Sequence, residues 1–294
     1  MQTVFTRNKN IVRTHKPVKG GTMSAVHFGP LDQPVKLVFL NANGFHGLSY
    51  RTILEPLGVH VIGLDLRGHG HTHLPLDKNF ASFHHYAKDV INYLEAHMTD
   101  KIVLAGHSLG ASSAILAAQI APDKISKVLA FDPIVLPIYV RMMMKTNMGR
   151  NYLCENFPMA KMAGNRRGIF KDHQTAFNRY RGRGTFKQFS DEALWDYVCG
   201  GFIQKDDHVR LACRPEWEQY TYVTQSHNLK KAIKGLPAHS RIMITDFVPQ
   251  GKWIGPMKKR RPDIRIDHLR KQDHFFPLMN PEISVPALRE ILGG

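Results

Sequence analysis

The chain has 294 residues, of which 43% are hydrophobic, so it can bury a sizeable core in one large α/β domain that carries an insertion. The count of three cysteines, without the spacing of a metal site, favours free thiols in a reducing compartment. Residues 1–20 are polar and basic and indicate no secretory signal. The longest apolar tract, residues 128–144, is interrupted by aspartate, proline and arginine, which excludes a membrane-spanning helix there. We therefore expect a cytoplasmic protein.

The net charge of +16 is concentrated in two stretches. Residues 141–187 contain eleven Lys or Arg and two acidic residues, and residues 252–271 contain eight and two. Such a field attracts anions, which include an acidic substrate, an anionic membrane surface and nucleic acid, although a solubilising surface is an equally good interpretation. No nucleic-acid-binding motif accompanies the two stretches, so nucleic acid is the least favoured partner.

Strand-like and helix-like segments alternate along the chain. Residues 1–30 alternate weakly and suggest edge strands. The buried strands that we predict are residues 35–40, 60–64, 101–105, 127–131, 241–245 and 264–267. Helical periodicity is clearest over residues 83–97 and 281–292. This order predicts an α/β fold with a mostly parallel central sheet and helices on both faces, with the functional residues at the carboxyl ends of the strands.

The pattern changes in the middle of the chain. Residues 137–229 contain helical segments and no recognisable buried strand. We therefore predict a helical cap at 137–229, inserted between a first core part at 1–136 and a second core part at 230–294.

Residues 106–110 read Gly-His-Ser-Leu-Gly between a β-prone run and an alanine-rich helical segment. A Gly-x-Ser-x-Gly sequence in that context predicts a nucleophile elbow, in which Ser108 is held above the sheet edge. A serine hydroxyl needs a base to take its proton. His274 is the candidate because it follows the last predicted strand and precedes the final helix.

Four motifs together resemble the α/β-hydrolase superfamily, most closely its capped single-domain bacterial serine hydrolases. They are residues 40–45 (Leu-Asn-Ala-Asn-Gly-Phe), 65–70 (Asp-Leu-Arg-Gly-His-Gly), 106–110, and 274–282, which begin His-Phe-Phe-Pro. The resemblance covers nearly the whole chain. Its motifs are specific for the fold and the catalytic machinery, but not for the substrate.

The resemblance implies a role for each matching residue. Ser108 would be the nucleophile, and His274 would be the general base and then the general acid. The backbone N–H groups of Leu109 and Phe45 would form the oxyanion hole. The family usually has His-Gly where this chain has Asn43-Gly44, a change that a backbone donor tolerates. No cofactor and no metal are implied.

The resemblance implies a catalytic triad of serine, histidine and an acidic residue, and the acidic residue is where this chain departs from the family pattern. The family usually places an aspartate a few residues past the strand predicted at 241–245, where this chain has none. We favour Asp132, at the end of the preceding strand, because some lipases of the superfamily keep their acid there. Asp246, at the end of the usual strand but slightly early, remains the alternative.

The resemblance also suggests a pocket and an activity. Asn43, Gly44, His107, Met142 and Met143 are the predicted pocket residues. The expected protein is a carboxylesterase-like or lipase-like hydrolase that cleaves a small ester through an acyl-enzyme. The ester would be lipid-like or anionic, and the basic cap would contact an anionic membrane. The alternatives are a carbon–carbon bond hydrolase, a cofactor-free peroxidase-like member and a non-catalytic ligand-binding member. The oligomeric state has no signal in the sequence.

Overall fold

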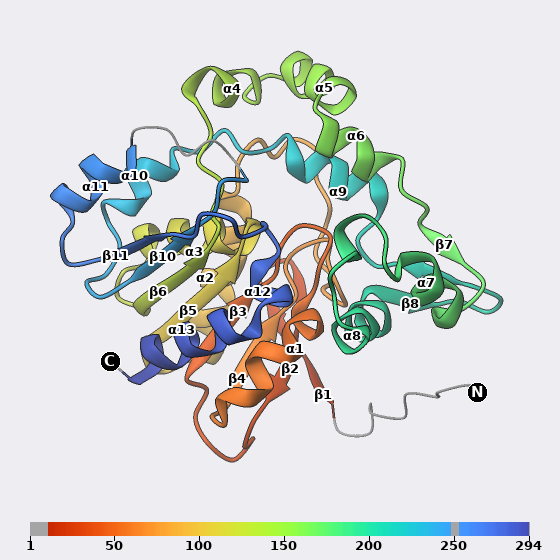
Figure 1. Ribbon diagram of the computed structural model, residues 1–294, viewed down its shortest axis with the longest axis horizontal. Helices are drawn as coiled ribbons and strands as arrows, with labels where there is room; N and C mark the ends of the chain where they lie inside the picture. Colours follow the sequence, from red (N-terminus) through yellow and green to blue (C-terminus); the bar gives the residue numbers. More distant parts are fainter. Residues whose placement is uncertain (1–10, 248–252, 294) are drawn as a thin grey trace.

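The computed structural model describes residues 11–247 and 253–293. Its centre is an eight-stranded sheet in the order β1-β2-β4-β3-β5-β6-β10-β11 (Figure 1). The first two strands are antiparallel and the other six are parallel, which confirms the predicted fold class. The strand bounds are β1 Val12–Val18, β2 Gly21–Phe28, β3 Leu37–Leu40, β4 Val61–Leu64, β5 Ile102–His107, β6 Ile125–Phe131, β10 Arg241–Ile244 and β11 Arg265–His268. The part of the predicted edge strands before residue 11 lies outside the described residues.

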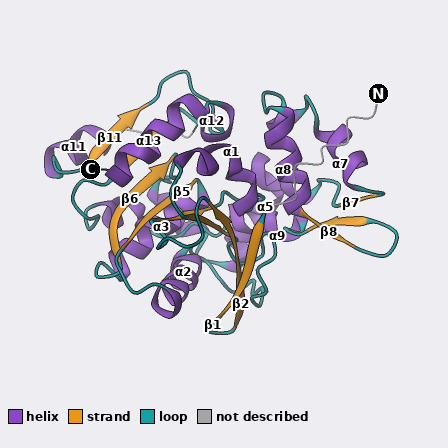
Figure 2. Ribbon diagram, turned by 90° about the horizontal axis from the view of Figure 1, so that it is seen from below, coloured by secondary structure: helices purple, strands orange, loops and turns teal. Residues whose placement is uncertain are grey.

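Helices cover both faces of this sheet, each over its own hydrophobic core (Figure 2). One face carries α2 (His84–His97), α3 (Leu109–Ile120), α10 (Leu229–Ile233) and α11 (Ile254–Arg260). The other face carries α1 (Arg51–Leu54), α12 (Phe276–Met279) and α13 (Pro281–Gly293). The central helix α3 is buried over most of its surface, and its alanines let it lie close to the strands. None of the described helices is long and apolar enough to cross a bilayer.

The segment 137–229 lies beyond the carboxyl ends of the parallel strands, with α4, α5 and α6 along the upper edge in Figure 1. The helices of this segment are α4 Ile138–Met143, α5 Asn147–Asn156, α6 Pro158–Gly164, α7 His173–Tyr180, α8 Asp191–Gly201 and α9 Pro215–Tyr222.

The expectation that this segment contains no buried strand is wrong. It contains a three-stranded antiparallel sheet formed by β7 (Ile169–Phe170), β9 (Val209–Leu211) and β8 (Phe202–Gln204), with buried residues in each strand. Strands of two or three residues are too short to show an alternating pattern in the sequence. The proposed domain boundaries stay a prediction.

The strand register brings distant residues to one edge. Leu40 pairs with Gly106, and Phe131 pairs with both His107 and Met243. The carboxyl ends of β3, β5, β6 and β10 therefore lie side by side in the sheet. The residues that follow these four strands consequently meet at the carboxyl edge of the sheet.

Candidate active site

Ser108 connects β5 to α3 with a left-handed backbone, at φ 54° and ψ −108°. A non-glycine residue rarely adopts a positive φ, and such strain is typical of functional turns. The flanking glycines allow the turn because strand and helix almost touch. A Cβ atom at Gly110 would lie 2.1 Å from the carbonyl oxygen of Leu40, and one at Gly106 would lie 2.5 Å from the carbonyl carbon of Gly110. The strand–Ser–helix geometry is therefore that of the predicted elbow.

Asp132 and His274 form a buried hydrogen-bonded pair. The Nδ1 atom of His274 lies 2.7 Å from Oδ2 of Asp132. Thr245 donates to the same carboxylate twice, from its backbone N–H to Oδ1 at 2.7 Å and from its hydroxyl to Oδ2 at 2.6 Å. Asp132 is fully buried, and its backbone is also left-handed, at φ 47°. The carboxylate is thus held rigidly against the histidine.

The charge state of Asp132 follows from these contacts. Burial alone raises the pKa of Asp132, but the hydrogen bonds and the charge interaction with His274, together with the two bonds from Thr245, outweigh burial. The pKa of Asp132 therefore lies below its usual value, and the group is ionised at neutral pH. An ionised carboxylate only accepts hydrogen bonds, so Nδ1 of His274 carries the proton and Nε2 is the basic nitrogen.

The alternative acid, Asp246, lies elsewhere. Its carboxylate is 2.7 Å from Nε2 of His268 and is largely exposed, and no described contact joins it to His274. Of the two candidates that the sequence left open, Asp132 is the one that the structure brings to His274.

His107, predicted as a pocket residue, instead bridges two loops behind the site. Its Nε2 donates to the backbone carbonyl of His274 at 2.9 Å, and its Nδ1 lies 3.0 Å from the hydroxyl of Tyr50. Tyr50 in turn accepts a hydrogen bond from the backbone N–H of Ala42. Burial lowers the pKa of His107 to about 3, so this chain of bonds is uncharged at neutral pH. It ties the loop after β3 to the loop that carries His274.

Ser108 and His274 line one cavity of about 210 Å³. Asn43 and Leu109 also line it, and most of its other lining residues are apolar. Those residues are Phe83, Ile134, Leu136, Val140, Met144, Leu153, Phe157, Met159, Tyr222 and Phe247. No hydrogen bond joins the Ser108 hydroxyl to His274 among the described contacts. The cavity has the size and lining of a site for a short apolar group.

Four of the predicted pocket residues are not on the wall of this cavity. Met142 is 53% exposed on the outside of α4, and neither it nor Met143 is a lining residue. The methionines that line the cavity are Met144, the residue that directly follows α4, and Met159 on α6. Gly44 lies against the carboxylate of Glu218, and His107 is buried behind the site. Asn43 does line the cavity, and its role in binding stays a prediction.

The two predicted oxyanion donors differ in their availability. Leu109 is the first residue of α3, so its N–H has no acceptor within the helix. The N–H of Phe45 already donates to the carbonyl of Ala42 at 3.1 Å, in a turn that Gly44 permits with φ 78°. A role for Phe45 therefore stays a prediction, and it requires Phe45 to share or exchange this hydrogen bond.

A second cavity, of about 410 Å³, adjoins the first. Asn43, Met159 and Tyr222 line both. The second cavity is basic, since Arg166, Arg167, Arg179 and Arg183 line it together with the single carboxylate of Glu218. Glu218 is paired with Arg166 at 2.6 Å, which leaves the charge of the other three arginines uncompensated within the cavity.

Residues 37–285 match the model of the alpha/beta hydrolase family. The chain therefore belongs to the alpha/beta hydrolase family. The resemblance predicted from the four motifs is confirmed.

Relatives within the family include several named hydrolases. The chain is 29% identical to esterase YbfF of Escherichia coli K12 over 239 residues, which covers 79% of this chain and 82% of that protein. It is 34% identical over 95 residues to 2-(acetamidomethylene)succinate hydrolase of Mesorhizobium japonicum. That match covers 30% of this chain and spans only 34% of the relative.

Solved structures share the fold at low identity. A crystal structure of E-2-(acetamidomethylene)succinate hydrolase superposes with a TM-score of 0.77 at 18% identity, over 97% of this chain and all of the other. The Mycobacterium tuberculosis esterase Rv0045c gives a TM-score of 0.72 at 16% identity, over 97% of this chain and 92% of the other. These likenesses concern the fold alone.

Proposed function

We propose that this alpha/beta hydrolase is a serine carboxylic ester hydrolase, with Ser108 as nucleophile, His274 as base and Asp132 as acid. The observation that carries the proposal is the buried 2.7 Å hydrogen bond between His274 and Asp132, at the cavity whose wall includes the strained Ser108. The esterases among the relatives support the same reaction class.

The reaction would proceed in two halves. The hydroxyl oxygen of Ser108 attacks the ester carbonyl carbon while Nε2 of His274 takes the hydroxyl proton. The N–H of Leu109 stabilises the oxyanion, the carbon–oxygen bond breaks, and the alcohol leaves with the proton from His274. In the second half, a water oxygen attacks the acyl carbon while Nε2 of His274 takes a water proton. The bond between the acyl carbon and the Ser108 oxygen then breaks, His274 returns the proton to that oxygen, and the carboxylic acid is released.

The two adjoining cavities support a class of substrate. An apolar acyl group of modest length fits the cavity of about 210 Å³ beside Ser108. The neighbouring cavity with Arg167, Arg179 and Arg183 favours an anionic group on the other part of the ester. The proposed substrate is thus a small ester that joins an apolar acyl chain to an anionic alcohol.

A fluorophosphonate label and a series of p-nitrophenyl esters test the reaction. The wild type should be labelled at Ser108 and should hydrolyse the esters, and Ser108→Ala should lose both properties. Labelling of the wild type without turnover of any ester would leave a serine-reactive protein with different chemistry. Absence of both would refute the proposal.

The second cavity needs a separate comparison. Arg179→Gln/Arg183→Gln should lower kcat/KM for an ester with a carboxylate-bearing alcohol at least tenfold, and should leave its neutral isostere within twofold. Arg181→Gln is the control for the single variants Arg179→Gln and Arg183→Gln, because Arg181 is paired with Asp191 and is not a lining residue. Equal losses for both esters would point to a structural role of the two arginines.

A further inference from the structure

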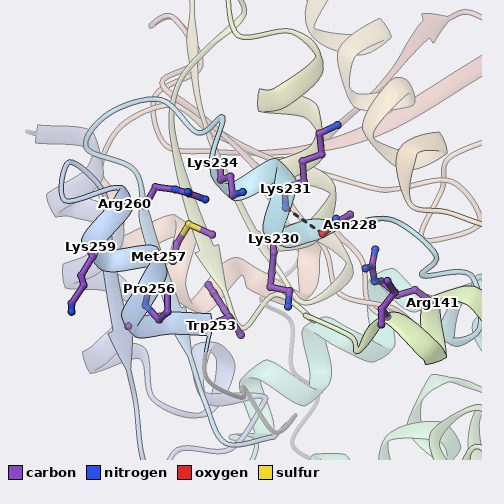
Figure 3. A pocket seen from close by; sticks show the side chains of 12 residues that line it. Arg141, Asn228, Lys230, Lys231, Lys234, Trp253, Pro256, Met257, Lys259 and Arg260 are labelled. Carbon is purple, nitrogen blue, oxygen red and sulfur yellow. Dashed lines mark hydrogen bonds between the residues drawn. The ribbon is translucent and has the colours of Figure 1, made fainter.

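A basic groove of about 1230 Å³ lies outside the two cavities, between α4, α10 and α11 (Figure 3). Its cations come from three distant parts of the chain: Arg141 on α4, Lys259 and Arg260 on α11, and Lys230, Lys231 and Lys234 on or just after α10. The fold thus joins both basic stretches of the sequence, and it adds a third group of lysines that lies in neither.

The positive charge of the groove is not neutralised locally. No Asp or Glu lines the groove within the described part of the chain. The nearby Asp263 is paired with Arg261, which is not a lining residue. Five of the six cationic residues are exposed, whereas Arg141 is half-buried and donates to the carbonyl of His227. Six cations without a carboxylate produce a strong attraction for anions.

One exposed apolar side chain lines the same groove, and others are exposed on the same helix and on the next one. Ile138 lines it and is 68% exposed, and on the same helix Tyr139 is also 68% exposed. On the neighbouring α5, Met148 and Tyr152 are exposed as well. Apolar and aromatic groups beside lysines and arginines are typical of surfaces that lie in the interface of an anionic bilayer.

The short helix α4 connects this surface to the candidate active site. Its residues Ile138 and Arg141 line the groove, while Val140 and the adjoining Met144 line the cavity that contains Ser108. A ligand bound in the groove would therefore be separated from the cavity that contains Ser108 by α4 alone.

We propose that α4, α5, α10 and α11 form a docking surface for an anionic lipid bilayer. The groove holds the phosphate of a lipid headgroup, and Ile138, Tyr139, Met142, Met148 and Tyr152 enter the interface. Charge complementarity favours this occupant, since the groove supplies the cations and the exposed side chains supply apolar area. Docking requires no turnover, so its test is independent of the ester hydrolase activity.

Sedimentation with vesicles tests the proposal. The full-length protein should bind vesicles of equal parts phosphatidylcholine and phosphatidylglycerol, but not vesicles of phosphatidylcholine alone. About 0.5 M salt should release most of it, because salt screens exposed charges. Absence of binding to the anionic vesicles, or equal binding to both compositions, would overturn the proposal.

Two matched pairs of variants locate the surface. Lys230→Glu/Lys234→Glu should weaken vesicle binding at least tenfold. Lys171→Glu/Lys205→Glu changes the net charge equally but lies just after β7 and β8, far from α10 and α11 in Figure 1, and should bind like the wild type. Likewise Ile138→Ser should weaken binding at least threefold, whereas Ile169→Ser, an exposed isoleucine on β7 far from α10 and α11 in Figure 1, should not. Equal effects within either pair would contradict the assigned surface.

Competition separates a lipid headgroup from other anions. Inorganic phosphate or glycerol phosphate at the concentration of the lipid phosphate should not displace the protein from the vesicles. Full displacement would show that the groove is a site for soluble phosphates. Tighter binding to a labelled nucleic acid duplex than to the vesicles would assign the groove to nucleic acid. Either result would overturn the lipid proposal.

Discussion

Asp132 and His274 are 142 positions apart in the chain and share a buried hydrogen bond of 2.7 Å. The bond fixes the tautomer of the histidine, because the ionised carboxylate takes the Nδ1 proton and leaves Nε2 free to accept one. Asp132→Asn should retain the shape of the site but favour the wrong tautomer, and should lower kcat about 10⁴-fold. Steady-state hydrolysis of a p-nitrophenyl ester measures this loss.

Asp246→Asn is the control for that substitution. Asp246 is bonded to the partly exposed His268, so this change should leave kcat within about twofold. The opposite ranking of the two variants would make Asp246 the acid.

Met144 should set the acyl chain length. Met144→Ala enlarges the cavity beside Ser108, so each methylene that enters the new space should raise kcat/KM about fourfold relative to the wild type. A series of p-nitrophenyl esters from acetate to decanoate measures the shift. Met142→Ala should leave the preference unchanged, because the Met142 side chain lies outside the cavity and is mostly exposed. An identical shift in both variants would show that the preference depends on the position or stability of α4 and not on the volume that Met144 occupies in the cavity.

Gly110 should tolerate no side chain. The Cβ atom of Gly110→Ala would lie 2.1 Å from the carbonyl oxygen of Leu40, so the helix must move away from the sheet, at a cost of about 3 kcal/mol in the free energy of unfolding. Urea unfolding measures the change. Gly255→Ala meets nothing within 4 Å in α11 and should be neutral or slightly stabilising. Unchanged stability in Gly110→Ala would contradict the close strand–helix packing.

Acid should unfold the protein through its buried histidines. Burial lowers the pKa of His46 and His69 to about 4, and that of His107 and His227 to about 3. These groups stay neutral when folded and bind a proton when unfolded, so their contribution is complete above pH 6.5 and is lost as the pH falls towards 4. Each should cost about 2 kcal/mol of unfolding free energy at pH 5 compared with pH 7.

Urea midpoints measured across that pH range test this dependence. In His227→Gln, the unfolding free energy should fall less between pH 7 and pH 5 than in the wild type, by the contribution of one buried histidine. His97→Gln is the control, since the side chain of His97 is partly exposed at the end of α2 and hydrogen-bonds to the carbonyl of Pro17. A stability that is constant from pH 7 to pH 5 would contradict the burial of these rings.

The fold could be predicted because its signals are local. The strand before Ser108, the glycines around it and the helix after it lie within about twenty consecutive residues. The other parallel strands also alternate with helical segments along the chain. The short strands β7, β8 and β9 could not be predicted, since two or three residues carry no period.

The site could be predicted only in part because its contacts are distant. Ser108 and His274 are predicted from their places in the order of elements, whereas the choice between Asp132 and Asp246 depends on which carboxylate reaches His274 in space. Thr245 and Tyr50 were missed for the same reason. Their hydroxyls act through the carboxylate of Asp132 and through His107, and no motif marks either residue. The inward turn of Met144 rather than Met142 depends on the rotation of α4, which a six-residue helix does not reveal in its sequence.

The left-handed backbones of Ser108 and Asp132 have an evolutionary consequence. Each costs about 1–3 kcal/mol of folding stability, and glycine would remove that cost while also removing the hydroxyl or the carboxylate. Selection for robustness and selection for turnover therefore act in opposite directions at these two positions. A laboratory search for heat-resistant variants that ignores activity should recover glycine at one of them, and a search that demands hydrolysis should never do so.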